Sequence, residues 1–198
     1  APCAAAPAEP VPPFRDQGCQ APLAFDAVLE RTSANAPYGW RFDSQSPDAL
    51  HVSHVFGDDP MGFAVPKYNA SAPAGMDIRA GDYITSIHGV AVSSKSMGEA
   101  LFKKTKVRLR VQRPECYFVE LNRGDRSLGL SLKYSKATSS VYIVGVDEGV
   151  VREQAPHVSA GHRIVGANGK KGIPVIELFE ALKGAEVTLE LSKVPQIQ

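Results

Sequence analysis

A glycine between two leucines marks the most suggestive short segment of the sequence, residues 126–132, which reads RSLGLSL. Because glycine has no Cβ, the backbone at Gly129 can turn and approach a ligand closely, with successive N–H groups pointing outward. Such a nest of donors binds anions and suits a carboxylate. Leu128 and Leu130 can line a hollow beside it, and Arg123 lies a few residues upstream. The pattern predicts an anion-binding loop at the entry of a strand.

The same residues also fit a structural role. Leu128 and Leu130 are expected to bury against a core at the start of a strand, whatever else they do. Arg123 is equally well explained as a solvated surface arginine. The anion-binding interpretation therefore depends on Gly129 and Arg123 together.

The elements that position this loop belong to a chain of ordinary composition. Its 198 residues suffice for one large domain or for two of about 80–100 residues. The chain has 43% hydrophobic and 22% charged residues and a net charge of +1. This balance gives no bulk electrostatic case for a nucleic-acid partner or an anionic membrane surface. No apolar run approaches the roughly 20 residues that cross a bilayer, so direct membrane insertion is not expected.

Residues 1–22 are rich in proline and alanine and predict an extended arm, because proline forbids a regular helix there. Cys3 and Cys19 could bridge this arm in an oxidising compartment. With Cys116 they make three cysteines without a Cys-x-x-Cys pair, so neither a zinc site nor a thioredoxin-like motif is predicted. The Ala/Pro-rich start without methionine fits a chain whose targeting peptide was removed, or one that was simply trimmed. The first alternative favours an organelle or extracytosolic compartment, such as a plastid lumen.

The rest of the chain contains an internal repeat. The segment AGDYITSIHGVAV at 80–92 is echoed by AGHRIVGANGKKG at 160–172, and KVRLRV at 106–111 is echoed by EVTLEL at 186–191. Both echoes lie 80 residues apart. A matched offset over two segments favours duplication over chance.

Two similar domains are predicted from this repeat. They occupy residues 23–113 and 115–193, meet at a linker near Pro114 and leave a short tail at 194–198. The first domain has a longer connection at 57–75, whose Gly, Pro and Asn residues predict an inserted surface loop rather than an element.

Each domain is predicted to be mostly β with one main late helix. Alternating and β-branched runs predict the strands, and apolar residues spaced three or four apart predict the helices. The helix of the second domain has Pro174 in its first turn and Gly184 at its end. The expected strands are 25–31, 49–56, 82–87, 106–111, 116–122, 140–146, 163–167 and 186–191, and the expected helices are 96–104 and 174–184.

The glycine loop and its surroundings resemble the PDZ-domain family. In that family a glycine between apolar residues forms a carboxylate-binding loop, often with a basic residue before it. Here Ser127, Leu128, Gly129 and Leu130, with Arg123 upstream, have this pattern.

The resemblance extends beyond the loop. A Gly-Asp-x-Ile turn at 81–84, the "HG" and "NG" turns that end at Gly89 and Gly169, the late helix and the final strand follow in the family's order. The likeness covers 23–113 and 115–193. It implies two PDZ-like units in tandem, each a partly open β-barrel or sandwich.

The resemblance also implies peptide binding by β-augmentation, in which a ligand strand adds to the strand that starts after the loop. The N–H groups of residues 128–130 would hold the terminal carboxylate of the ligand, and Arg123 would attract it from a distance. On the late helix, Val175 and Phe179 would contact ligand side chains. Because Val175 stands where the family often has a histidine, an apolar ligand residue is expected there.

The first domain departs further from the family pattern. Its loop, residues 37–40, has Pro37, which removes one N–H donor, and Trp40, which is bulkier than the usual pocket residue. No arginine aligns with Arg123, although Arg31 and Arg41 lie nearby. A filled groove or a purely structural contact is therefore expected in this half. The residues assigned to its doubtful peptide site are Tyr38, Gly39, Trp40 and Met97.

Residues for catalysis or metal binding are sparse. His51 and His54 project to opposite faces of a strand, so they are not expected to share a metal ion. The Ser-Ser-Lys at 93–95 is similar to Ser/Lys pairs of some proteases, but the chain has no Gly-x-Ser-x-Gly motif and no room for a catalytic domain. His162 replaces Asp82 of the first repeat and is expected to lose a local turn contact. No catalytic residue, metal or cofactor is predicted.

A non-enzymatic scaffold is the predicted function. It would bind C-terminal or extended peptides of protein partners, mainly through the second domain, and would not bind nucleic acid. One alternative is a structural accessory subunit of a large complex, such as an organellar membrane-associated assembly, with degenerate grooves. A second is a regulatory PDZ fragment of a quality-control protease. The basic run KKTKVRLR at 103–110 is either the solvated face of a strand or a mark of an acidic partner.

Overall fold

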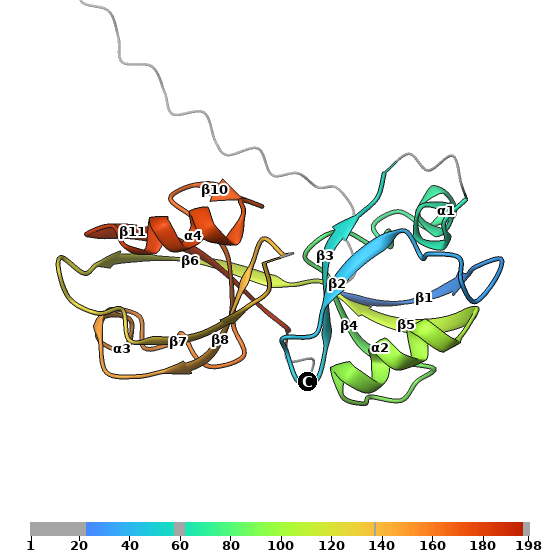
Figure 1. Ribbon diagram of the computed structural model, residues 1–198, viewed down its shortest axis with the longest axis horizontal. Helices are drawn as coiled ribbons and strands as arrows, with labels where there is room; N and C mark the ends of the chain where they lie inside the picture. The colour runs from blue at the N-terminus through green and yellow to red at the C-terminus, as the bar shows by residue number, and fades with distance from the viewer. Residues whose placement is uncertain (1–22, 58–61, 137, 196–198) are drawn as a thin grey trace, which may run out of the picture.

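The computed structural model describes residues 23–57, 62–136 and 138–195. Two units, each built on its own antiparallel sheet, lie side by side and meet where the first unit's last strand leads into the second unit (Figure 1). The arm at 1–22, with Cys3 and Cys19, lies outside the described residues. None of the helices in the described ranges is long and apolar enough to cross a membrane.

The first unit is a five-stranded antiparallel sheet with two helices. Its strand order is β1-β5-β4-β3-β2, so β2 lies at one edge. Helix α2 is capped by Ser93, whose side chain accepts a hydrogen bond from the Ser96 N–H. The elements are β1 (Ala24–Glu30), β2 (Trp40–Asp43), β3 (Leu50–Val55), α1 (Ala64–Ser71), β4 (Tyr83–Ile87), α2 (Ser94–Lys103) and β5 (Lys106–Gln112).

The second unit repeats this plan. Its main strands are ordered β6-β11-β9-β8-β7, with the two-residue β10 paired to β9, and β7 takes the edge position of β2. The mostly β, two-unit fold predicted from the sequence is therefore confirmed. The elements are β6 (Glu115–Asn122), β7 (Leu130–Tyr134), β8 (Val141–Val146), α3 (Val150–Gln154), β9 (Arg163–Ala167), β10 (Lys170–Lys171), α4 (Val175–Leu182) and β11 (Glu186–Lys193).

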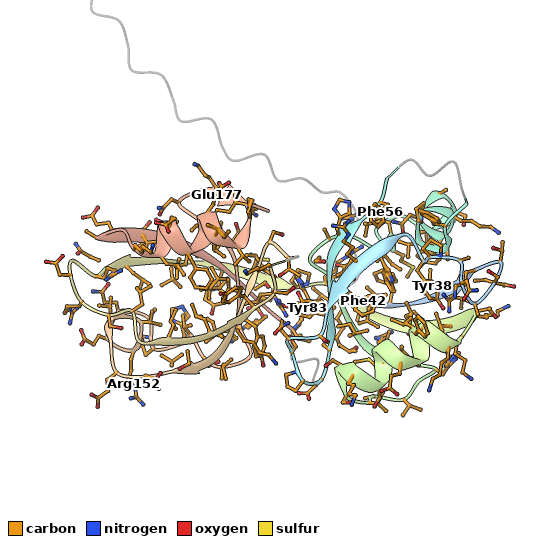
Figure 2. All side chains as sticks on the ribbon, viewed as in Figure 1. Tyr38, Phe42, Phe56, Tyr83, Arg152 and Glu177 are labelled. Atoms are coloured by element: carbon orange, nitrogen blue, oxygen red, sulfur yellow. The ribbon has the colours of Figure 1, made fainter. Side chains whose placement is uncertain are left out.

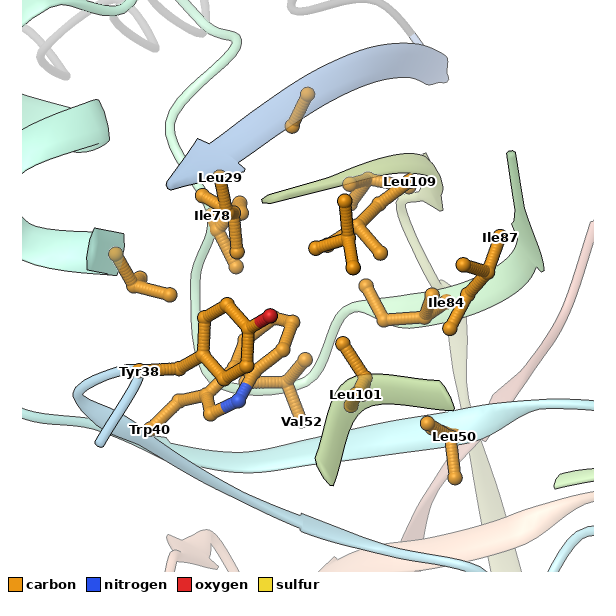
Figure 3. Packing of buried hydrophobic residues seen from close by; sticks show 14 of the residues in the cluster. Leu29, Tyr38, Trp40, Leu50, Val52, Ile78, Ile84, Ile87, Leu101 and Leu109 are labelled. Atoms are coloured by element: carbon orange, nitrogen blue, oxygen red, sulfur yellow. The ribbon is translucent and has the colours of Figure 1, made fainter. Parts of the chain in front are cut away.

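Each unit has its own hydrophobic core. In β5 the side chains of Val107, Leu109 and Val111 are fully buried, while Lys106 before them and Arg108 between them face solvent. This alternation follows from the two-residue period of a strand. A close view of the first core shows aromatic and branched aliphatic side chains from the sheet packed against α2 (Figure 3).

The connection at 57–75 contains a helix that the sequence analysis missed. Helix α1 places Val65 in the core with no exposed surface. Pro66 is tolerated because it lies in the first turn, where its missing N–H would have no helical acceptor. The side chain of Asn69 then fixes the exit by bonding both the N–H and the carbonyl of Ile78, each at 2.8 Å. The Pro and Asn that suggested a loop therefore belong to a short helix.

A buried ion pair joins the two units. Arg163, in β9 of the second unit, has no exposed surface and donates two hydrogen bonds to Asp43 of the first unit, at 2.9 and 3.0 Å. It also donates to Ser46 Oγ and Ser140 Oγ, both at 3.1 Å. A bidentate guanidinium–carboxylate pair fixes distance and orientation together. The end of β2 is thus tied to the second unit.

Two neighbours complete this contact. His51 Nδ1 lies 3.2 Å from Asp43 Oδ2, and burial, opposed by this hydrogen bond, lowers the pKa of His51. Burial alone raises the pKa of Asp43, but the hydrogen bond from His51 and the charge of Arg163 outweigh it, so the pKa is below its usual value. At neutral pH the Arg163–Asp43 pair is therefore charged and His51 is neutral.

The second neighbour is Tyr83. Its hydroxyl, at the junction in Figure 2, lies 3.1 Å from Ser192 Oγ of the second unit.

Replacement of Arg163 by alanine should uncouple the units. It leaves the Asp43 carboxylate buried without its cation, a change that typically costs about 3–5 kcal/mol. The free energy of unfolding, measured by urea denaturation, should fall by that amount, and cleavage at the linker near Pro114 by a protease should accelerate.

Arg126→Ala is the matched control, because Arg126 pairs with Glu153 at 2.8 Å on the surface. An exposed pair of this kind contributes at most about 1 kcal/mol. Equal losses of stability in the two variants would contradict a coupling role for Arg163.

Candidate functional site

The loop at 127–130 is held tightly by the chain that follows β8. Gly129 has φ of +72°, and a Cβ there would lie 2.7 Å from the Glu148 carbonyl oxygen. The Gly129 carbonyl accepts from the Asp147 N–H at 2.9 Å, and the Leu128 carbonyl accepts from Val151 at 3.1 Å. Only glycine fits this backbone.

The first unit builds the same loop. Gly39 has φ of +87°, and a Cβ there would lie 2.7 Å from Phe63 Cβ. Its carbonyl accepts from the Phe56 N–H at 3.0 Å, and the Tyr38 carbonyl accepts from Val65 at 2.8 Å. The short helices that follow β3 and β8 therefore support equivalent loops at the entries of β2 and β7.

Arg123 lies at the end of the late helix of the second unit. Its backbone N–H donates to Ala185 O at 2.8 Å, and its side chain donates to Leu182 O at 3.0 Å and to Arg126 O at 2.7 Å. Leu182 is the last residue of α4. The guanidinium thus satisfies a carbonyl that has no partner within the helix.

Arg31 is the counterpart of Arg123, and the expectation that the first domain has none is wrong. Its backbone N–H donates to Thr105 O at 2.9 Å, 80 residues before Ala185. Its side chain donates to the carbonyls of Leu101 at 3.0 Å and Phe102 at 2.6 Å, at the end of α2. Sequence alignment missed it because the two loops differ in length, whereas the hydrogen bonds to Thr105 and Ala185, the residues directly before β5 and β11, identify it.

A cavity of about 370 Å³ opens in the first unit between the edge strand β2 and helix α2. Trp40 and Phe42 of β2 form one wall. Gly98, Leu101 and Phe102 of α2 form the other. Its remaining lining comes from the loop before β2 and comprises Arg31, Ala34, Asn35, Ala36, Pro37 and Tyr38.

The cavity has an aromatic wall with an exposed rim. The Tyr38 and Trp40 rings are 6.0 Å apart and both are buried (Figure 3). The Trp40 and Phe42 rings meet edge to face at 6.2 Å. Phe42 is 36% exposed and Phe102 79% exposed. Aromatic side chains left in contact with water at the mouth of an apolar hollow are typical of a binding site.

The second unit has a ring contact between its edge strand and its late helix. The rings of Tyr134, the last residue of β7, and Phe179 of α4 meet edge to face, with centroids 4.9 Å apart. These rings join the far end of the edge strand to the helix. Leu128 and Leu130 are partly buried against the core, and the N–H of Gly129 donates to Ser127 Oγ at 3.2 Å.

The other residues assigned from the sequence lie as follows. Val175 is 3% exposed and belongs to the second core, which Phe179 covers from outside. Tyr38, Gly39 and Trp40 adjoin or line the first cavity, but Met97 has no exposed surface and lies in the core beneath it. The residues of α2 that face the cavity include Gly98 and Phe102. The first of them is one residue later in the helix than the predicted Met97.

His162 keeps the turn contact that it was expected to lose. Its Nδ1 accepts from the Ser159 N–H at 3.3 Å, as the Asp82 carboxylate accepts from the Arg79 N–H at 2.8 Å in the first unit. The Tyr117 hydroxyl lies 2.6 Å from the same nitrogen. An imidazole nitrogen here performs the acceptor role of the carboxylate.

Sequence reasoning missed Phe42, Gly98, Leu101 and Phe102 as cavity residues. The available signal was the spacing of Trp40 and Phe42, which a strand places on one face. The stripe Gly98–Leu101–Phe102, three and four residues apart, was the corresponding helical signal.

No family model matches this chain, and no curated protein matches it. Solved structures do. The structure of INAD PDZ45 in complex with NG2 peptide is 22% identical, covers 88% of this chain and 91% of its own, and has a TM-score of 0.38. MUPP1 PDZ4 is 20% identical over 42% of this chain and 80% of its own, with a TM-score of 0.37.

A choanoflagellate GIPC PDZ domain bound to B1AR peptide is 20% identical over 42% of this chain and 96% of its own, with a TM-score of 0.36. These similar structures are all PDZ domains.

Gly129→Ala should destabilise the second unit, so this variant does not affect binding alone. A left-handed alanine costs roughly 1–2 kcal/mol, and the contact with the Glu148 backbone adds about 1–3 kcal/mol of overpacking. The free energy of unfolding should fall by about 3 kcal/mol.

Gly172→Ala is the control, since Gly172 has φ of +64° but nothing within 4 Å of a Cβ. It should lose only the roughly 1–2 kcal/mol of the backbone term. Urea denaturation of both variants measures the difference, and equal losses would show that the contact with Glu148 does not constrain the loop.

Proposed function

We propose that this chain is a protein-interaction module that binds extended peptide segments by addition to a sheet edge. The observation that carries the proposal is the apolar cavity of about 370 Å³ between the edge strand β2 and helix α2. An added ligand strand hydrogen-bonds to the free backbone edge, and every second side chain points toward the helix.

The first unit is the better-formed of the two sites. Its mouth has Phe42 and Phe102 exposed to solvent, and burying them under a ligand would add hydrophobic free energy of about 25 cal/mol for each Å² covered. In the second unit the Tyr134 and Phe179 rings already join the edge strand to the helix. A peptide that binds along that groove, as the sequence favoured, has to displace this contact.

The proposed role is non-enzymatic. The buried ion pair of Arg163 and Asp43 is assigned to the contact between the two units.

Selection of a random nine-residue peptide library against the whole chain tests the proposal. Peptides should be enriched, and Phe102→Ala should weaken the best of them at least about tenfold, as expected for an aromatic residue at the centre of an interface. Fluorescence polarisation measures the affinity.

Phe118→Ala is the matched control. Phe118 is 63% exposed on β6, in the second unit, so its loss should leave the affinity unchanged. If no peptide is enriched, or if both variants bind like the parent chain, the proposal is wrong. The accessory-subunit role, in which the grooves bind no peptide, would then be favoured.

A further inference from the structure

The arginine of the first cavity has little capacity left for a ligand. Arg31 donates to the carbonyls of Lys104 at 3.0 Å, Ala36 at 3.0 Å, Leu101 at 3.0 Å and Phe102 at 2.6 Å. A guanidinium has five N–H groups, so four of them are used within the protein.

The loop beside it offers backbone donors only. Pro37 has no N–H, which leaves the N–H groups of residues 38–40. The hydroxyl of Tyr38 is not free for a ligand, because it donates to Lys104 O at 2.7 Å, and the Tyr38 ring lies under the Arg31 guanidinium at 4.6 Å. A terminal carboxylate entering here would lose its water with few side-chain donors to replace it, which is costly.

Uncompensated positive charge nevertheless lies at this end of the cavity. In the basic run at 103–110, Lys106 faces Glu30 at 3.2 Å and Arg110 faces Asp26 at 3.3 Å across β1 and β5. Lys103 and Lys104, at the end of α2 beside Phe102, take part in none of the ion pairs among the described residues. Both are exposed.

We infer that the first groove binds an internal, acidic stretch of a partner protein rather than a free C-terminus. The inference depends on the proposed function of this same cavity. An apolar side chain of the partner occupies the cavity, and the partner chain continues past the loop. Its acidic side chains then lie near Lys103 and Lys104.

The geometry of an extended strand fits this arrangement. Side chains two residues apart point to the same side, about 6.5–7 Å apart. One apolar residue in the cavity therefore places the residue two positions further along close to the end of α2. Because ion pairs with exposed lysines are weak individually, the apolar anchor supplies most of the affinity and the acidic residues supply selectivity.

Two display formats of one random nonapeptide library test the inference against the whole chain. In one format the peptides lie between two carrier domains, and in the other they end at a free C-terminus. The internal format should be enriched in peptides with aspartate or glutamate next to an apolar residue. The best peptide should bind equally well as an isolated amide and as a free acid.

Lysine variants locate the contact. Lys103→Gln combined with Lys104→Gln should weaken the best internal peptide about threefold to tenfold, the loss expected for two exposed charge pairs. Lys67→Gln, an exposed lysine on α1 of the same unit, should have no effect. Phe42→Ala should weaken the same peptide, which assigns it to the first groove.

The outcomes distinguish a failure of this inference from a failure of the proposed function. Enrichment in the C-terminal format alone, or a large loss on amidation, would overturn the inference while leaving peptide binding intact. Internal peptides without acidic residues, or insensitive to Lys103 and Lys104, would also overturn it. If neither format yields a binder, the proposed function itself fails.

Discussion

The edge strand β2 is held at both of its ends, and the proposed site depends on this constraint. At its start, Gly39 packs so closely against Phe63 and Pro66 that no side chain fits. At its end, Asp43 is bound by two hydrogen bonds from Arg163 of the second unit. The second unit therefore helps to shape the groove of the first. A buried ion pair contributes little net stability compared with apolar packing, but it specifies one arrangement strongly.

The two units have the same arrangement of elements but different grooves. In each, a glycine loop, an arginine at the helix end and an edge strand occupy equivalent places, as the matching hydrogen bonds of Arg31 and Arg123 show. The difference lies in a few side chains. In the first unit the Phe42 ring lies against Gly98, 3.9 Å from where a Cβ would stand, whereas in the second unit the Phe179 ring meets Tyr134.

The sequence predicted the fold well because the fold depends on periodicity. Alternating residues of β5 and β11 and the echo around Tyr83 and Arg163 are repeated patterns that the structure reproduces. Helix α1 was missed because Pro66 and Asn69, which usually interrupt helices, here lie in the first turn and near the end. Local composition does not show where in a turn such residues stand.

The site was harder to predict, since it depends on which side chains remain available after packing. The sequence favoured Arg123 and the 127–130 loop on the strength of a motif, but a motif does not report that Tyr134 and Phe179 meet between β7 and α4. Likewise, nothing local to Arg31 shows that four carbonyls from α2 and its surroundings surround it. Nor does the pairing of Arg163 with Asp43, 120 residues apart, have a sequence signal.

Hydrogen–deuterium exchange of the whole chain, with and without a saturating selected peptide, tests the central claim most directly. A ligand strand added to β2 shields amides along Trp40–Asp43 from solvent, so their exchange should slow strongly while that of Leu130–Tyr134 is unchanged. Slower exchange confined to Leu130–Tyr134, or no change at either edge, would contradict the assignment of the binding site to the first unit.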